Sequence, residues 1–123
     1  MVSPELRQLF AEDVVFLKYL GVNPVVVHGG GPQIGAVMER MGLKPRFVDG
    51  HRITDEETMD IVEMVLAGKV SKGIVSEIQR AGGKAVGLSG KDGFLLQARK
   101  KKLKVARAGT DESELIDIGL VGE

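Results

Sequence analysis

The stretch VVVHGGGPQIG, residues 25–35, joins three β-branched residues to a histidine, three consecutive glycines and a proline. Consecutive β-branched residues are typical of a buried strand covered on both faces, as in parallel sheets flanked by helices. Pro32 suits the first turn of a helix, and the glycines leave the connection between the two elements without side chains. The stretch therefore predicts a strand, a bare loop and a helix in succession, which is the repeating unit of α/β folds.

The composition indicates one folded domain over residues 1–123, with 43% hydrophobic residues, 28% charged residues and no cysteine. The 17 basic and 17 acidic side chains balance one another, which argues against a general polyanion binder. No apolar run approaches the roughly 20 residues that span a bilayer, and no signal sequence follows Met1. We therefore expect no nucleic-acid partner, no membrane segment and a cytoplasmic location.

The first half of the chain has clear helix boundaries. Ser3 is expected to cap a helix that ends at Gly21, because apolar residues recur at helical spacing between them. A buried strand is expected over residues 23–28. The next helix is expected to begin at Pro32 and to stop at Gly42, a residue suited to a left-handed cap.

The middle of the chain predicts two more helices and a second strand. Thr54 and Glu57 have the spacing of a capping box, and the helix after them is apolar around much of its circumference. We expect this helix to be largely buried and to end at Gly68. Another helix is expected over residues 70–80, and KAVGLSG, residues 84–90, is a second buried-strand candidate that ends on a glycine.

Three further segments predict turns and strands. Asp49-Gly50 lies between two short β-prone pieces, which is a strong hairpin signal, and residues 91–93, KDG, are expected to turn the chain. The basic run RKKKLK, residues 99–104, is expected to be a solvated hairpin or loop; a phosphate or nucleic-acid patch is less favoured because no aromatic residues interleave with it. The final residues, IDIGLVGE, predict a strand, and an α/β domain that stops on a strand leads us to expect a partial domain.

The glycine loop is a candidate anion-binding site. The N–H groups at the start of a helix attract carboxylate or phosphate, and glycines allow such a ligand to approach the backbone. A dinucleotide fingerprint is disfavoured, because Gly29, Gly31 and Gly35 are spaced G-x-G-x-x-x-G, and no Walker loop is complete. The alternative is a sharp turn that binds nothing.

Several side chains near these segments are candidates for chemistry. His28 is expected to be a hydrogen-bonded structural residue rather than a base, and His51 a hairpin surface residue without metal-ligand partners. Arg52 follows the tight turn and either grips a carboxylate through two parallel hydrogen bonds or is an exposed salt-bridge partner. No metal site is predicted, because the three neighbouring acids fit better as first-turn residues of a helix: Asp55, Glu56 and Glu57.

Three stretches carry a resemblance to a known family: VVVHGGGP, FVDGHRITDEETMDIVEMVLAGKVSKGIV and AVGLSGKDG. They resemble the amino acid kinase family, and within it the N-acetylglutamate kinases of arginine biosynthesis, over nearly the whole chain. The resemblance implies an αβα sandwich with a mainly parallel open sheet, the carbamate kinase-like fold, in which residues 1–123 form the N-acetylglutamate-binding half. It also implies transfer of the γ-phosphoryl group of ATP, with Mg²⁺, to the side-chain carboxylate of N-acetyl-L-glutamate.

The resemblance also assigns individual residues. Gly30 and Gly31 match the glycines whose backbone lies against the substrate and the transferring phosphoryl group, and Arg52 matches the arginine that holds the substrate's α-carboxylate. The family's lysine-bearing first strand is expected before residue 1, and its catalytic aspartate, second lysine and ATP site after residue 123. We therefore expect no catalytic residue within the chain and no kinase activity from it alone.

The family pattern suggests a homodimer formed through a helix near residues 69–80, with hexamers and inhibition by arginine in some members. Two other functions stay open. One is the kinase-like, arginine-sensing domain of an N-acetylglutamate synthase, and the other is a ligand-binding or assembly module without catalysis. A dinucleotide-binding domain is disfavoured by the glycine spacing and by the lack of a well-placed acid after a second strand.

Overall fold

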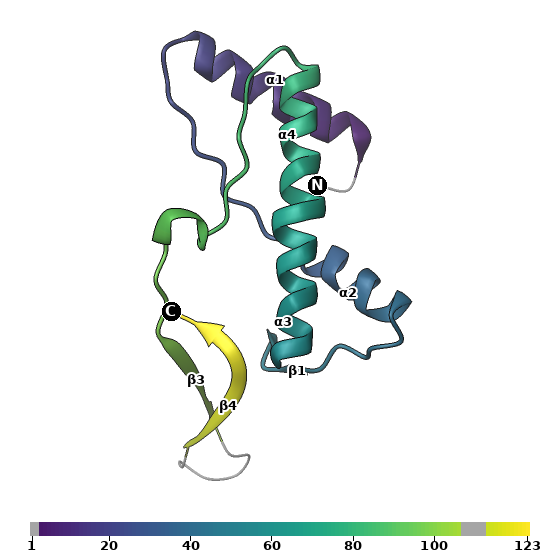
Figure 1. The fold of residues 1–123 in the computed structure, drawn as a ribbon, viewed down its shortest axis with the longest axis vertical. Coiled ribbons are helices and arrows are strands. Elements are labelled where there is room, and N and C mark those ends of the chain that lie inside the picture. Colours follow the sequence, from purple (N-terminus) through teal and green to yellow (C-terminus); the bar gives the residue numbers. More distant parts are fainter. Residues whose placement is uncertain (1–2, 107–112) are drawn as a thin grey trace.

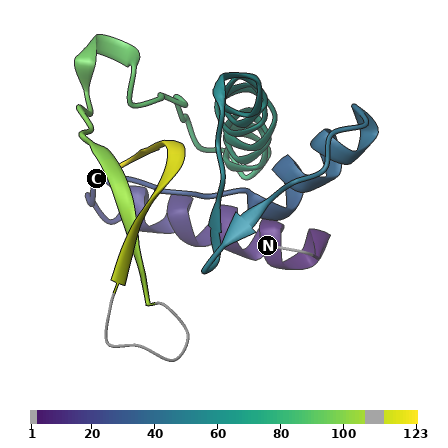
Figure 2. The same cartoon turned by 90° about the horizontal axis from the view of Figure 1, so that it is seen from below.

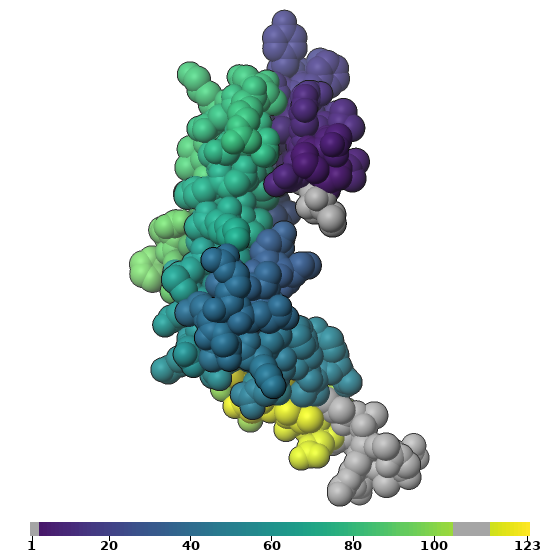
Figure 3. Space-filling view, turned by 90° about the vertical axis from the view of Figure 1, so that its right-hand side faces the viewer, coloured from purple at the N-terminus to yellow at the C-terminus, as the bar shows by residue number. Residues whose placement is uncertain are grey.

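The computed structural model describes residues 3–106 and 113–123. Its longest feature is a helical rod in which α3, a π-helical turn and α4 follow one another without a break, with α1 beside one part of it and α2 beside another (Figures 1 and 3). The helices are α1 (Pro4–Tyr19), α2 (Gly31–Arg40), α3 (Glu56–Glu63), the π-helical turn (Met64–Val70), α4 (Ser71–Arg80) and a 3-10 turn (Asp92–Phe94). The strands are β1 (Phe47–Val48), β2 (His51–Arg52), β3 (Lys100–Ala106) and β4 (Ser113–Gly122).

The first two helices confirm their predicted boundaries. The Ser3 hydroxyl oxygen accepts a hydrogen bond from the Leu6 backbone N–H at 3.2 Å, which caps α1. Gly21 and Gly42 follow α1 and α2 with φ angles of 88° and 76°, which place both glycines in the left-handed region. Glycine adopts this region without steric cost, so both residues stop their helices as expected.

The predicted break at Gly68 is wrong. The chain remains helical through this residue, as a π-helical turn between α3 and α4. Residues on both sides, Val65 and Ser71, are buried, whereas Gly68 is exposed. A glycine inside a helix costs about 1 kcal/mol, and burial of the flanking side chains outweighs this cost. The expected burial of this helix is confirmed only along one face, since Met64 is 57% exposed.

The predicted capping box at Thr54 and Glu57 is also wrong. The residue that caps α3 is Asp55, whose carboxylate oxygen accepts a hydrogen bond from the Thr58 backbone N–H at 2.9 Å. Thr54 is 4% exposed and its hydroxyl donates to the Arg52 carbonyl oxygen at 3.1 Å. The Thr54 hydroxyl is therefore bonded to the backbone of β2, and the next residue, Asp55, caps α3.

The sheet structure differs from the expected parallel arrangement. The paired strands of the described part form two antiparallel ladders, β1 with β2 and β3 with β4, and one parallel bridge joins Thr54 to Gly119. Residues 23–30, expected to hold a strand, are extended but have no ladder partner within the described residues. Their side chains still alternate as in a strand, because Val25 and Val27 are 87% and 91% exposed while Val26 is half-buried. The architecture is thus α/β with small sheets, in which the expected strand is extended without pairing.

The second expected strand, residues 84–90, is also not paired in a ladder within the described residues. Residues 83–89 are outside any ladder, and Val86 is 83% exposed. Their inner side packs against the rod: an added Cβ at Gly87 would lie 2.2 Å from the Ser71 hydroxyl oxygen. After them the chain turns through Asp92–Phe94, as the KDG pattern predicted.

The best-buried core cluster joins α2 to α3 and the π-helical turn. It consists of Ile34, Met38, Ile61 and Val65, each 6% exposed or less. Five partly buried residues pack around it: Val37, Leu43, Val62, Leu66 and Val70. This cluster fixes α2, and with it the end of the glycine loop, against the rod.

The basic run lies on β3 of the curved β3–β4 hairpin, which confirms the hairpin prediction for residues 99–104 and the strand prediction for the last residues (Figure 2). Lys100 Nζ lies 2.9 Å from the Asp117 carboxylate, and this hydrogen bond lowers the pKa of the Asp117 carboxyl below its usual value. Leu103 is 9% exposed, so the strand has an inner side. None of the helices within residues 3–106 and 113–123 has the length and apolarity to cross a membrane.

Candidate functional site

The glycine loop, residues 29–31, lies where the extended segment 23–28 enters α2. Gly30 is the N-cap of α2, and its carbonyl oxygen accepts the first hydrogen bond of the helix from the Ile34 N–H at 2.9 Å. Gly30 offers no side chain to cap the helix, and the first turn contains no acidic residue. The partial positive charge at this end of α2 is therefore not balanced by a carboxylate of its own turn.

The three glycines of the loop differ in how much space surrounds them. A Cβ at Gly30 would lie 2.8 Å from Cδ2 of Leu66 and 3.2 Å from Cγ2 of Val70, so the backbone of the middle glycine touches the π-helical turn. A Cβ at Gly29 or Gly31 would meet no described atom within 4 Å. Packing thus explains the middle glycine, whereas the outer two leave the loop open.

Arg52 is brought to this loop from β2. Asp49 and Gly50 both have positive φ angles, 45° and 75°, and form the tight turn that pairs Phe47 with Arg52 across the hairpin. The Arg52 guanidinium donates through Nη2 to the Gly31 carbonyl oxygen at 3.4 Å. The structure therefore brings together the glycines and the arginine that the sequence singled out.

Two further residues hold the guanidinium of Arg52. Its Nη1 donates to Sδ of Met38 at 3.2 Å, and its Cζ lies 4.7 Å from the centroid of the Phe47 ring. Within the described residues the acceptors of Arg52 are a thioether and a carbonyl, both uncharged. A guanidinium with neutral acceptors beside a helix N-terminus can bind an anionic group, since both carry positive charge.

The sequence reasoning missed the residues that support the site. Phe47 could have been found, because a two-residue turn at Asp49-Gly50 places it directly opposite Arg52. Met38 and Leu66 could not, since their contacts depend on how α2 packs against the rod.

Both histidines and Asp55 lie within hydrogen-bond distance of nearby backbone groups. His28 Nδ1 is 3.3 Å from the Gly29 carbonyl oxygen, and His51 Nδ1 is 3.0 Å from that of Asp49. Hydrogen bonds from the Thr58 side chain and backbone lower the pKa of the Asp55 carboxyl below its usual value. Within residues 3–106 and 113–123, no group of three or more His, Asp or Glu side chains is placed to hold a metal ion.

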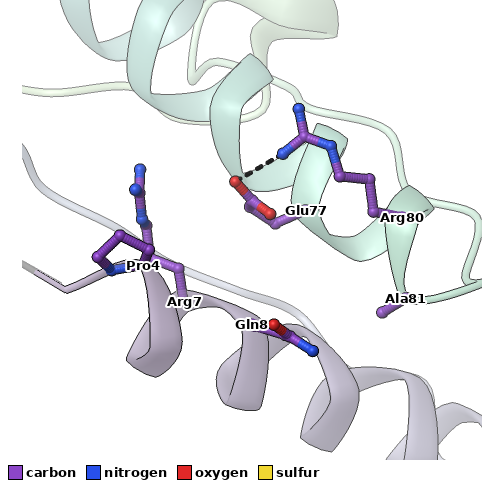
Figure 4. A pocket seen from close by; sticks show the side chains of 6 residues that line it. All are labelled: Pro4, Arg7, Gln8, Glu77, Arg80 and Ala81. Atoms are coloured by element: carbon purple, nitrogen blue, oxygen red, sulfur yellow. Dashed lines mark hydrogen bonds and ion pairs between the residues drawn. The ribbon is translucent and has the colours of Figure 1, made fainter.

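A separate surface pocket of about 410 Å³ lies between α1 and α4 (Figure 4). Its lining comprises Pro4, Arg7, Gln8, Glu77, Arg80 and Ala81. The Arg80 guanidinium donates to the Glu77 carboxylate at 2.9 Å, so the charge of this arginine is already matched. The pocket includes no residue of the glycine loop or the hairpin, and we do not assign the candidate site to it.

Comparison with known proteins decides the family. The sequence profile described as "Amino acid kinase family" matches residues 2–118. The chain belongs to the amino acid kinase family. Curated members similar to it are named acetylglutamate kinase: those of Syntrophus aciditrophicus (60% identical over 123 residues), Leptospira biflexa (59%) and Methanocaldococcus jannaschii (57%).

Each of these alignments covers 100% of this amino acid kinase family chain, but 42%, 42% and 41% of the respective relatives. The chain thus spans less than half the length of the curated relatives it matches. The glycine loop, the β1–β2 hairpin and the helical rod all lie within residues 2–118, which the family profile covers.

Proposed function

We propose that this chain is the N-acetyl-L-glutamate-binding part of an acetylglutamate kinase, which transfers the γ-phosphoryl group of ATP to the side-chain carboxylate of N-acetyl-L-glutamate. The observation that carries the proposal is the Arg52 guanidinium beside Gly31 at the start of α2. The similarity to proteins named acetylglutamate kinase, at 57–60% identity over the whole chain, supports it.

Arg52 takes the α-carboxylate of the substrate in this proposal. Two parallel N–H donors match the two oxygens of a carboxylate, and such charge-assisted bonds are stronger than the present bonds to a thioether and a carbonyl. Stacking on Phe47 keeps the plane of the guanidinium fixed while its donors change partners.

The backbone of Gly30 and Gly31 lies against the substrate and the transferring phosphoryl group in this proposal. An oxygen of the substrate's side-chain carboxylate forms a bond to the γ-phosphorus as the bond from that phosphorus to its bridging oxygen breaks, and the electron pair leaves with ADP. The substrate itself is the nucleophile, so the protein's task is positioning and charge stabilisation. Backbone N–H groups at the start of α2 suit this task, since no acid of the first turn competes for them.

ATP is the phosphoryl donor, and Mg²⁺ bound to its phosphates is the expected metal. We assign no residue of this chain to either of them and no residue to catalysis. A finer proposal on the fold is that residues 23–28 and 84–89 are strands of a mainly parallel sheet in an αβα sandwich. The alternating exposure of Val25, Val26 and Val27 supports this, because alternation is the pattern of a strand.

We also propose a cytoplasmic enzyme that is at least a homodimer, with hexamers and arginine inhibition as open properties. The expected dimer helix includes α4, but Ile78 on this helix is 6% exposed within the single chain. Ile78 is therefore intramolecular core, and a dimer contact through α4 has to use its other residues. Light scattering of the full-length gene product, with and without arginine, tests the oligomeric state, and an ADP-release assay with added arginine tests the inhibition.

The decisive experiment is a test of the full-length gene product for ADP release that depends on N-acetyl-L-glutamate, in the presence of ATP and Mg²⁺. L-Glutamate is the matched control substrate, because it differs only in lacking the acetyl group. Titration calorimetry with N-acetyl-L-glutamate is performed on the same protein and on the isolated 123-residue chain. We expect turnover with N-acetyl-L-glutamate only, and none from the isolated chain.

The other outcomes distinguish the alternatives. Binding of N-acetyl-L-glutamate without ADP release supports a binding or assembly module. Formation of N-acetyl-L-glutamate from acetyl-CoA and L-glutamate, together with arginine binding, supports a synthase. Turnover by the 123-residue chain alone contradicts the expectation that it is inactive.

A further inference from the structure

The π-helical turn between α3 and α4 changes which residues of the rod face inward. In an uninterrupted α-helix, residues three and four positions apart share a face. Val65 is buried, yet the residues at that spacing after it, Gly68 and Lys69, are exposed. Val70 is instead partly buried and Ser71 is buried, five positions after Val65 and Leu66 respectively. The wider turn therefore shifts the apolar face of the rod by about one residue, a rotation of about 100° in α-helical terms.

The shifted face meets the glycine loop. Cδ2 of Leu66 and Cγ2 of Val70 are the atoms that an added Cβ at Gly30 would approach, at 2.8 Å and 3.2 Å. Gly30 has a φ angle of −177° and a ψ angle of 34°, so it lacks the positive φ that favours glycine. Two side chains of the π-helical turn occupy the space beside its Cα, which leaves little room for a Cβ.

These two side chains differ from the core in what they contact. The fully buried residues of the cluster, Ile61 and Val65 among them, join α3 and the turn to α2. Leu66 and Val70 lie at the edge of that cluster and reach past it to the backbone of Gly30. Isolated π-helical turns occur frequently at functional sites, where the extra residue redirects side chains.

We propose that Leu66 and Val70 are positioning residues, which press on the Gly30 backbone and hold the N–H groups of the glycine loop toward the transferring phosphoryl group. This inference rests on the proposed function. It predicts that loss of these side chains loosens the loop and slows the transfer step, while Arg52 still binds the substrate carboxylate.

The test compares four variants of the full-length gene product. Leu66→Ala and Val70→Ala remove the contacts, and Leu66→Met refills the space with a side chain of similar volume. Met64→Ala is the matched control, since Met64 belongs to the same turn but is 57% exposed. The readouts are kcat, KM for N-acetyl-L-glutamate, the melting temperature, and hydrogen exchange of the Ile34 backbone amide, which donates to the Gly30 carbonyl oxygen.

We expect Leu66→Ala and Val70→Ala to lower kcat about tenfold or more and to leave KM for N-acetyl-L-glutamate within about twofold. Exchange at the Ile34 amide should become at least about tenfold faster. Leu66→Met should recover both properties, and Met64→Ala should retain them. A Leu66→Ala variant with a lower melting temperature but wild-type kcat and exchange overturns the inference, because Leu66 then only fills space.

The exchange measurement separates this inference from the proposed function. If the wild-type protein shows no transfer to N-acetyl-L-glutamate, the proposed function fails. Exchange at the Ile34 amide, the donor to the Gly30 carbonyl oxygen, still decides whether Leu66 and Val70 hold the loop. Faster exchange in the alanine variants alone supports the inference, and unchanged exchange rejects it.

Discussion

Thr54 and Gly119 form a parallel bridge that fastens β4 to the chain two residues after Arg52. The Thr54 N–H donates to the Ile118 carbonyl oxygen at 2.9 Å, and the Leu120 N–H donates to the Thr54 carbonyl oxygen at 2.6 Å. The Thr54 hydroxyl in turn donates to the Arg52 carbonyl oxygen at 3.1 Å. The strand that carries the candidate substrate-binding arginine is thus linked to the C-terminal hairpin by backbone and side-chain hydrogen bonds.

Gly119→Ala should destabilise the fold strongly. A Cβ at this position would lie 2.0 Å from the Thr54 carbonyl oxygen, and Gly119 has a φ angle of 84°. The positive φ and the broken bridge together should lower the free energy of unfolding of the full-length protein by about 3 kcal/mol, measured by urea denaturation. Gly42→Ala is the control, since its φ is 76° but an added Cβ meets no described atom within 4 Å, and it should cost about 1 kcal/mol. Equal losses in the two variants would show that the bridge contributes little.

Arg52→Ala should weaken binding of N-acetyl-L-glutamate by about 2–4 kcal/mol in calorimetric titration of the full-length protein, because a charged, hydrogen-bonded pair loses one partner. Binding of an ATP analogue should stay nearly unchanged. Arg46→Ala is the matched control: Arg46 lies close to the same hairpin, but its side chain is 67% exposed and 3.8 Å from Asp55. An equal loss of affinity for both ligands would mean that Arg52 is structural.

Phe47→Leu tests the stacking on Arg52. The guanidinium carbon lies 4.7 Å from the ring centroid, and a cation–π contact at a partly exposed site contributes about 0.5–1 kcal/mol. We expect the Kd for N-acetyl-L-glutamate to rise about two- to fivefold in Phe47→Leu. Phe47→Tyr keeps an aromatic face and should bind as the wild type does. If the tyrosine variant is weakened as much as the leucine variant, the aromatic face is not what holds Arg52.

Asp55→Asn tests the cap of α3 through its pH dependence. Hydrogen bonds from the Thr58 side chain and backbone N–H lower the pKa of Asp55 in the folded protein below its unfolded value. The stabilisation is therefore complete above the unfolded pKa, near about 3.9, and is lost as the pH falls through the folded pKa. Asparagine also caps helices but does not titrate in this range, so the unfolding free energy of Asp55→Asn should fall less steeply below about pH 4.

Asp55→Ala provides the comparison for that experiment, because it removes the capping oxygen as well as the charge. It should be less stable than Asp55→Asn at every pH, measured by urea denaturation between about pH 2 and pH 7. Identical acid slopes in the wild type and Asp55→Asn would contradict the assigned pKa shift.

Sequence patterns predicted the helix ends and turns that are set by one or two neighbouring residues. Ser3, Gly21, Gly42 and the Asp49-Gly50 turn each fix a boundary through one side chain or one φ angle, and each was found where expected. The pairing of the glycine loop with Arg52 was anticipated only by family resemblance, since their separation along the chain gives no local signal.

The predictions of the α3 cap, the break at Gly68 and the first strand were not met, because contacts between distant segments decide these features. Thr54 and Asp55 are both good caps, and the bridge to Gly119 engages Thr54, which leaves the cap to Asp55. Gly68 is a helix breaker by propensity, but buried neighbours on either side keep the chain helical. The β-branched residues 25–27 were expected to be a paired strand, and only their alternation is present in the described residues.

The bridge between Thr54 and Gly119 also affects the order in which parts of the protein fold during synthesis. Contacts between segments close in sequence form before those that close a long loop, and a ribosome delivers the N-terminal part first. We therefore expect the glycine loop and the π-helical turn to form their contact once the rod has been synthesised, before β4 is made. The β1–β2 hairpin is equally local, so only its fastening to Gly119 through Thr54 has to follow the synthesis of β4.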